Sequence, residues 1–158
     1  MDTRNEIPAR DLEQFHARAM DMIAESRTII RAAVATGFDV KKKPDGSYVT
    51  NVDLKVEEHL RGRIQRHFPE HGIIGEEYPP TRPDAAFQWI MDPIDGTEDF
   101  VYRVPTFGTI LALHYRGQPV IGILDHPMLD LCVSAAYGQG TRKNGERVML
   151  TDIDLAAI

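Results

Sequence analysis

Two segments in the first half of the chain place apolar residues at helical spacing. In residues 11–36 the apolar side chains recur at steps of three, four and seven, with charged residues mostly between them. From Thr50 to about Phe68 they recur at steps of four. This periodicity predicts two long amphipathic helices, each with one face turned toward a core. Gly37 is placed to end the first helix in a left-handed conformation, and Thr50 or Asn51 can cap the second.

The pattern changes to short apolar runs in the second half of the chain. These runs cover residues 106–115, 119–125, 129–137 and 147–150, and turn residues separate them, including the glycine-rich stretch 138–145. That order predicts an antiparallel meander. Shorter strands are expected at residues 73–74 and 89–91, and the second should end at Asp92, because Pro93 lacks a ladder donor. Together these elements predict an α+β fold with two long helices packed on a mostly antiparallel sheet.

The composition is typical of one globular domain. The chain has 158 residues, of which 42% are apolar, and this is long enough for one substantial core. It contains no uninterrupted apolar segment of membrane-spanning length, and its first residues lack the basic-then-apolar order of a signal peptide. We therefore expect one domain over residues 1–158, a mobile N-terminus over residues 1–10, a cytoplasmic location and no membrane partner.

Charge and cysteine content exclude two further classes. The formal net charge is −6, and the only basic cluster is residues 41–43. A nucleic-acid surface needs clustered Lys and Arg, so we expect no nucleic-acid partner. The single cysteine, Cys132, lies in an apolar run, which excludes an internal disulfide and predicts a buried structural thiol.

Candidate chemistry is concentrated in residues 89–100. Asp92 and Asp95 stand three residues apart around Pro93, on a turn where their oxygens can converge on a hard cation such as magnesium. Gly96 and Thr97 follow, and the next residues can start a helix whose free amides would face a phosphate. A lone pair of aspartates at this spacing is commonly a solvated turn, so the pair needs support from the rest of the chain.

Two upstream motifs supply that support. Thr50-Asn51-Val52-Asp53 and Gly75-Glu76-Glu77 precede Asp92-Pro93-Ile94-Asp95-Gly96-Thr97 in that order, and Phe100 follows. The three motifs together resemble the signature of the inositol monophosphatase family, the magnesium-dependent, lithium-sensitive sugar phosphatases. The resemblance covers residues 10–150, roughly the first half of a family member. It implies the first half of the layered α/β/α/β/α sugar-phosphatase fold.

The resemblance also implies a set of metal ligands. Glu76, Asp92 and the main-chain carbonyl of Ile94 would bind the first magnesium, Asp92 would bridge, and Asp95 would help to hold the second. Two or three ions per site are implied. The chain ends at Ile158, before the motif that in relatives supplies another aspartate, so the second metal site is expected to be incomplete.

Catalytic and phosphate-binding roles follow from the same resemblance. Thr97 with Asp53 would position the attacking water, and Glu76 is the potential water activator. The amides of Gly96 and Thr97 would hold the phosphate, as would Lys42, which lies in the basic turn before Asp53. One departure from the family pattern is the acidic pair at residues 98–99, which either repels the substrate phosphate or points outward.

The sequence therefore predicts a magnesium-dependent phosphomonoesterase that hydrolyses a small polyol or alcohol phosphate, such as myo-inositol monophosphate, with metal-activated water. Histidinol phosphate is an alternative substrate, because residues 105–113 and 121–127 look more like the histidinol-phosphatase branch. A truncated, non-catalytic metal-binding or regulatory module is the alternative from another class. Apolar strand faces over residues 107–133 would be exposed in this chain, which predicts a homodimer.

Overall fold

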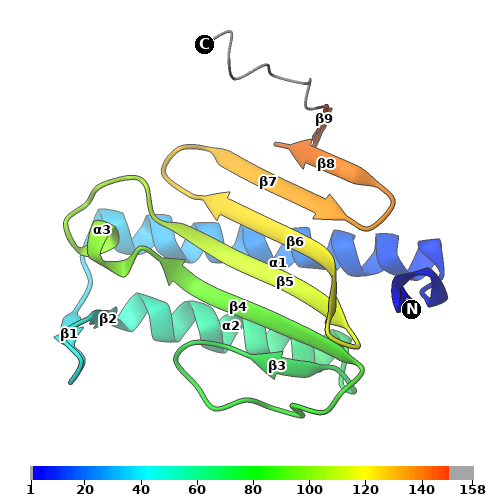
Figure 1. The fold of residues 1–158 in the computed structure, drawn as a ribbon. Coiled ribbons are helices and arrows are strands. Elements are labelled where there is room, and N and C mark those ends of the chain that lie inside the picture. The colour runs from blue at the N-terminus through cyan, green and yellow to red at the C-terminus, as the bar shows by residue number, and fades with distance from the viewer. Residues whose placement is uncertain (1, 150–158) are drawn as a thin grey trace, which may run out of the picture.

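Two long helices lie on one face of a twisted sheet in the computed structural model, which describes residues 2–149 (Figure 1). Helix α1 spans Ala9–Thr36 and helix α2 spans Asn51–His67, so the periodicity in the sequence is confirmed. Gly37 ends α1 with a φ of 99°, and its amide donates to the Ala33 carbonyl at 2.8 Å. Thr50 caps α2 by accepting from the amides of the first helical turn.

The sheet has seven strands in sequence order, β3 to β9. Their bounds are β3 Gly72–Ile74, β4 Phe87–Asp95, β5 Gly108–Tyr115, β6 Gln118–His126, β7 Leu131–Ala136, β8 Gly140–Lys143 and β9 Glu146–Val148. Among the strands of residues 2–149, only the β3–β4 pair is parallel; the other neighbours are antiparallel. The predicted α+β fold with a meander is confirmed, but β8 forms where the glycine-rich stretch 138–145 predicted only a turn. Leu150, the predicted end of the last strand, lies outside the described residues.

Strand β4 continues past the point where the sequence predicted its end. The prediction that β4 stops at Asp92 is wrong, because the strand runs on to Asp95. Pro93 is accommodated because the β4–β5 register shifts between Asp92 and Asp95, so no ladder donor is required there. The Thr109 hydroxyl of β5 donates to the Pro93 carbonyl at 2.8 Å and secures this irregular segment.

Three smaller elements complete the fold. Strands β1 (Val40–Lys42) and β2 (Tyr48–Thr50) form a separate hairpin, and α3 (Thr97–Val101) follows β4. Figure 1 shows the hairpin and α3 at the same end of the molecule, where β4 finishes. The 3-10 turn η1 (Thr3–Glu6) lies at the opposite end, where the Thr3 amide donates to the Gln118 side chain of β6 at 3.1 Å.

One core fills the space between the helices and the sheet. Its largest buried side chains come from both long helices, from β3, β4 and β5, and from α3 and the segment between α3 and β5; they include Ile30, Leu60, Trp89, Phe100 and Phe107. Cys132 is buried and unpaired, and burial raises the pKa of its thiol to about 11. Across residues 2–149, no helix has both the length and the apolarity needed to span a membrane.

Candidate active site

Four segments meet at the end of β4 and line a pocket of about 380 Å³ that is open to solvent. They are the β1–β2 hairpin, the loop after β3, the turn after β4 and the start of α3. The lining includes Lys42, Tyr48, Glu76, Gly96, Thr97 and Glu98. One predicted metal ligand, Glu76, and the three predicted phosphate-binding residues, Lys42, Gly96 and Thr97, therefore line one cavity, although more than fifty positions separate the first from the last.

Asp53 is held rigidly at the start of α2. It is buried and forms a capping box with Thr50, whose amide donates to Asp53 Oδ2 at 2.8 Å. The Thr97 hydroxyl lies 3.4 Å from Asp53 Oδ1 and 3.0 Å from the Ile94 carbonyl oxygen. Burial raises the pKa of Asp53, against the hydrogen bonds from Thr50. The structure thus brings together the two side chains, Asp53 and Thr97, that the sequence assigned to one water.

Asp92 carries an oxygen that nothing in the described protein satisfies. The residue is partly buried, and its Oδ1 is buried without a hydrogen-bond partner among residues 2–149. Burial first, and then the negative charges of Glu76 and Asp95, raise the pKa of Asp92 to about 7. A carboxylate oxygen left unpaired among other carboxylates is the donor set that a hard divalent cation prefers. The residues at this point therefore fit a magnesium ion in their chemistry.

Glu76 has a basic partner that the sequence did not predict. Lys43 Nζ lies 3.3 Å from Glu76 Oε1 and 2.8 Å from Glu77 Oε1. Burial opposes the charge on Lys43, but the hydrogen bonds to Glu77 and Glu76 outweigh it and raise the pKa of the lysine. Lys42, the residue predicted from the sequence, lines the pocket instead. Neighbouring residues leave an extended chain in opposite directions, so a run of three lysines does not by itself say which one reaches the carboxylates.

Glu57 was also missed, and it holds the loop that carries Glu76. It is fully buried in α2, accepts hydrogen bonds from the Glu77 amide at 2.8 Å and the Tyr78 amide at 3.2 Å, and pairs with Arg61 at 2.8 Å. A side chain at Gly75 would place its Cβ 2.0 Å from Glu57 Oε1, so this position requires glycine. Helical spacing was an available signal, because Glu57 stands one turn after Asp53 on the same face.

The predicted ligands lie close together without forming a finished metal cage. Asp95 is exposed at the end of β4, and Ile94 is buried with its carbonyl directed at Thr97. In the part of the chain that the structure describes, no three His, Cys, Asp or Glu side chains are arranged so that they could hold a metal ion. Because Lys43 Nζ lies 3.3 Å from Glu76 Oε1, an ion between Glu76 and Asp92 would compete with Lys43 for that oxygen.

The acidic pair after Thr97 divides between two environments. Glu98 lines the pocket, whereas Asp99 turns away and accepts a hydrogen bond from the Thr106 hydroxyl at 2.6 Å. Gly96 has a φ of 80°, which favours glycine at this turn. Helix α3 has only five residues, so its dipole is small, and any phosphate at this turn would depend on individual amides.

Comparisons with known proteins agree with the fold and with the motifs. The chain matches the Inositol monophosphatase family over residues 11–156. It is 34% identical over 149 residues to the chloroplastic bifunctional phosphatase IMPL2 of Arabidopsis thaliana, an alignment that covers 93% of this chain and 43% of that protein. It is 36% identical over 116 residues to a histidinol-phosphatase of Chlorobaculum parvum, which covers 73% of this chain and 45% of the relative.

A solved structure shows the same architecture. An IMPase/NADP phosphatase complexed with Mg2+ and phosphate superimposes with a TM-score of 0.79 at 26% identity, over 87% of this chain and 53% of that one. The chain thus spans about half the length of the proteins that it matches. With a family match across nearly all of its sequence and the corresponding fold, this chain belongs to the inositol monophosphatase family.

Proposed function

We propose that this chain carries the metal and phosphate site of a magnesium-dependent phosphomonoesterase that hydrolyses a small polyol or alcohol phosphate, such as myo-inositol monophosphate. The observation that carries the proposal is the unpaired, buried oxygen of Asp92, which has Glu76 and Asp95 as acidic neighbours, the first of which lines a pocket of substrate size. A carboxylate in this state is unfavourable for the metal-free fold and favourable for binding a cation.

The metal would be held by Glu76, Asp92, Asp95 and the carbonyl of Ile94, which all lie at the β4 end of the sheet. Bound magnesium supplies positive charge to the phosphoryl oxygens and lowers the pKa of a water molecule. Two or three ions would bind per site, and the residues described here would leave the second site incomplete. Lys43 stabilises the charge of Glu76 in the metal-free protein, since it lies within hydrogen-bond distance of that carboxylate.

Phosphate and water would be bound by separate parts of the same pocket. The amides of Gly96 and Thr97 and the ammonium group of Lys42 supply donors for the phosphate oxygens. When the Thr97 hydroxyl donates to Asp53, its oxygen is left as an acceptor that can orient one proton of the attacking water. Glu76 is the group that would accept a proton from that water. Because Asp53 is fixed by its capping box, this acceptor is positioned before substrate arrives.

Histidinol phosphate is the second candidate substrate. It is favoured by the similarity to the histidinol-phosphatase of Chlorobaculum parvum, in addition to the sequence of β5 and β6. Hydrolysis of a bisphosphate substrate ranks below both candidates. A second phosphate group would need a second basic side chain, and the residues lining the pocket include no basic group other than Lys42.

A homodimer is part of the proposal. Both long helices cover the same face of the sheet, and the opposite face presents Ile110, Leu124 and Val133 in one row across β5, β6 and β7. Ile110 is 37% exposed, and a second copy of the chain would remove this row from water. A dimer in sedimentation at low micromolar concentration is expected, and a monomer alone would contradict it.

Phosphate release tests the catalytic proposal. The substrates are inositol 1-phosphate and histidinol phosphate, with magnesium, with and without lithium. We expect lithium-sensitive release that falls by about 10³-fold in Asp92→Asn, the loss typical of removing a group that stabilises transition-state charge. Asp84→Asn is the matched control, because Asp84 is an exposed acid in the loop before β4. Release that is equal in Asp92→Asn would overturn the proposal.

The alternative of a metal-binding or regulatory module without catalysis predicts a different result when the melting temperature of the same protein is measured with magnesium. Magnesium that binds only the folded state must raise the melting temperature by mass action. If magnesium stabilises the chain, Asp92→Asn abolishes that stabilisation and no phosphate is released, the chain is a metal-binding or regulatory module.

A further inference from the structure

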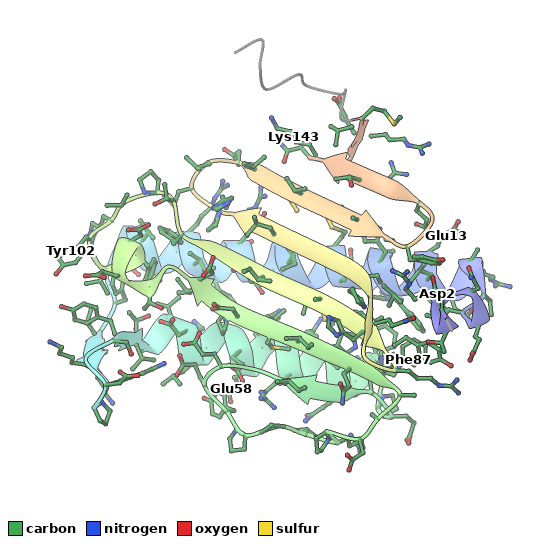
Figure 2. All side chains as sticks on the ribbon, in the orientation of Figure 1. Asp2, Glu13, Glu58, Phe87, Tyr102 and Lys143 are labelled. Carbon is green, nitrogen blue, oxygen red and sulfur yellow. The ribbon has the colours of Figure 1, made fainter. Side chains whose placement is uncertain are left out.

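The pocket has an acidic and aromatic side that the phosphatase mechanism does not use. Glu98 and Tyr48 line it from α3 and β2. Tyr102, at the end of α3, meets Tyr48 edge-on with ring centroids 6.4 Å apart, and Figure 2 shows it projecting at this end of the molecule. A hydrogen bond with Tyr48 and, more weakly, the charge of Glu98 raise the pKa of Tyr102, so the carboxylate lies within electrostatic reach of Tyr102.

Glu98 differs from its neighbour in having no protein partner to explain it. The Asp99 carboxylate accepts from Thr106, whereas the exposed carboxylate of Glu98 has no side-chain hydrogen bond or ion pair among residues 2–149. Helix α3 is too short for Glu98 to be explained by the helix dipole. A lone carboxylate beside the donors for a phosphate repels that phosphate, unless the substrate brings a positive charge of its own to this side of the pocket.

We propose that Glu98, with Tyr48 and Tyr102, binds a positively charged group on the alcohol part of the substrate, so that the site prefers phosphate monoesters carrying an ammonium or similar cation. This rests on the proposed function, because it names the substrate class of the same pocket. The carboxylate supplies the ion pair, and the tyrosine faces supply cation–π attraction. A volume of about 380 Å³ accommodates a phosphate and a short cationic chain together.

The experiment compares esters that differ in one terminal group. 2-Aminoethyl phosphate and propyl phosphate have the same length and differ as ammonium against methyl; 2-hydroxyethyl phosphate adds a neutral hydrogen-bonding group. In kcat/KM with magnesium we expect the amine to be preferred over propyl phosphate by about tenfold, the ratio that one partly exposed ion pair with a cation–π contact supplies. Glu98→Gln should reduce the preference to about twofold.

Asp99→Asn is the matched control, since it removes one negative charge next to Glu98 from a side chain that is turned to Thr106. It should retain the preference for the amine. Equal rates for the amine and propyl esters in the unaltered protein overturn the inference. A loss in Glu98→Gln that is the same for the amine and the hydroxyl ester also overturns it, because a hydrogen bond would then explain the effect.

A binding measurement separates this inference from the proposed function. If none of the three esters is hydrolysed, the proposed function fails, and the esters are instead titrated against the magnesium-loaded protein by calorimetry. Tighter binding of the amine that is lost in Glu98→Gln then supports the cation site, and equal binding of all three esters overturns it.

Discussion

Two carboxylates on the same sheet, one fully and one partly buried, have opposite surroundings. Asp125 of β6 is fully buried and bound by Arg27 of α1, with Nε 3.2 Å from Oδ2 and the second guanidinium nitrogen on Oδ1. Asp92 of β4 is partly buried, has one oxygen without a partner in the described protein, and has Glu76 and Asp95 as its nearest charges. The charge of Asp125 is therefore compensated within the chain, whereas the described residues do not compensate that of Asp92, the carboxylate for which we propose a cation.

The two regions are connected through one residue of the strand between them. Thr109 of β5 pairs with Asp125 in the β5–β6 register, and its hydroxyl donates to the Pro93 carbonyl beside Asp92. The Arg27–Asp125 ion pair joins α1 to β6, and β6 pairs with β5. The Thr109 hydroxyl of β5 in turn binds the irregular part of β4. The internally paired carboxylate therefore supports the segment that presents the unpaired one.

The largest expected effect comes from breaking the Arg27–Asp125 pair. Arg27→Met leaves the Asp125 charge buried without compensation, and we expect a loss of about 3–5 kcal/mol in the free energy of unfolding. Urea unfolding in the absence of magnesium measures it. Arg27→Met combined with Asp125→Leu should recover much of the loss, because the uncompensated charge is then gone.

A nearby arginine provides the control for that prediction. Arg31 pairs with Asp130 at 2.5 Å, but Asp130 is 76% exposed. Arg31→Met should cost only about 1 kcal/mol, since exposed pairs contribute little. If the two arginine variants lose the same free energy of unfolding, the buried Arg27–Asp125 pair contributes no more than the surface pair. Asp125 is then no example of a buried charge that depends on its partner, and the contrast with Asp92 fails.

Much of the fold follows from patterns that the sequence displays directly. The two helices, the meander and the capping role of Thr50 depend on periodicity and local chemistry, and the structure has all three. The end of β4 did not follow, because a register shift and the hydroxyl of Thr109 accommodate Pro93. Both depend on a strand thirteen or more residues further along the chain, which local rules do not see.

The candidate site shows the same division between local and distant information. Its motif residues were predicted because three short motifs occur in order, and several of them line one pocket. Lys43 and Glu57 were missed because their importance comes from contacts with the loop around Glu76, twenty or more positions away. The split between Glu98 and Asp99 was left open by the sequence, since the direction of a side chain depends on which partner, here Thr106, is within reach.

A smaller effect is expected for Asp92, whose contribution to the free energy of unfolding should depend on pH. In metal-free protein the pKa of Asp92 is about 7, against 3.8 for the ordinary group, so the folded state holds a proton that the unfolded state releases between these values. Its contribution to stability is complete below about pH 4 and is lost as pH rises through about 7. We expect a loss of about 2 kcal/mol over this range, roughly half of the full linkage because Asp92 is partly solvated.

Asp92→Asn isolates this contribution from those of other groups. Burial raises the pKa of Asp53 and lowers that of His71 to about 4, so these two residues add slopes of opposite sign to the total. They are present in both proteins and cancel in the difference between native and Asp92→Asn unfolding free energies, measured by urea in EDTA from pH 4 to pH 8. That difference should fall as pH rises, and the Asn variant should become the more stable protein near neutrality.

Magnesium at neutral pH should restore the stability of the native protein and leave that of Asp92→Asn unchanged, because binding to the folded state favours the ionised carboxylate. Parallel curves for the two proteins would show that Asp92 is as well satisfied as Asp125, and the reason for assigning a cation to it would be gone.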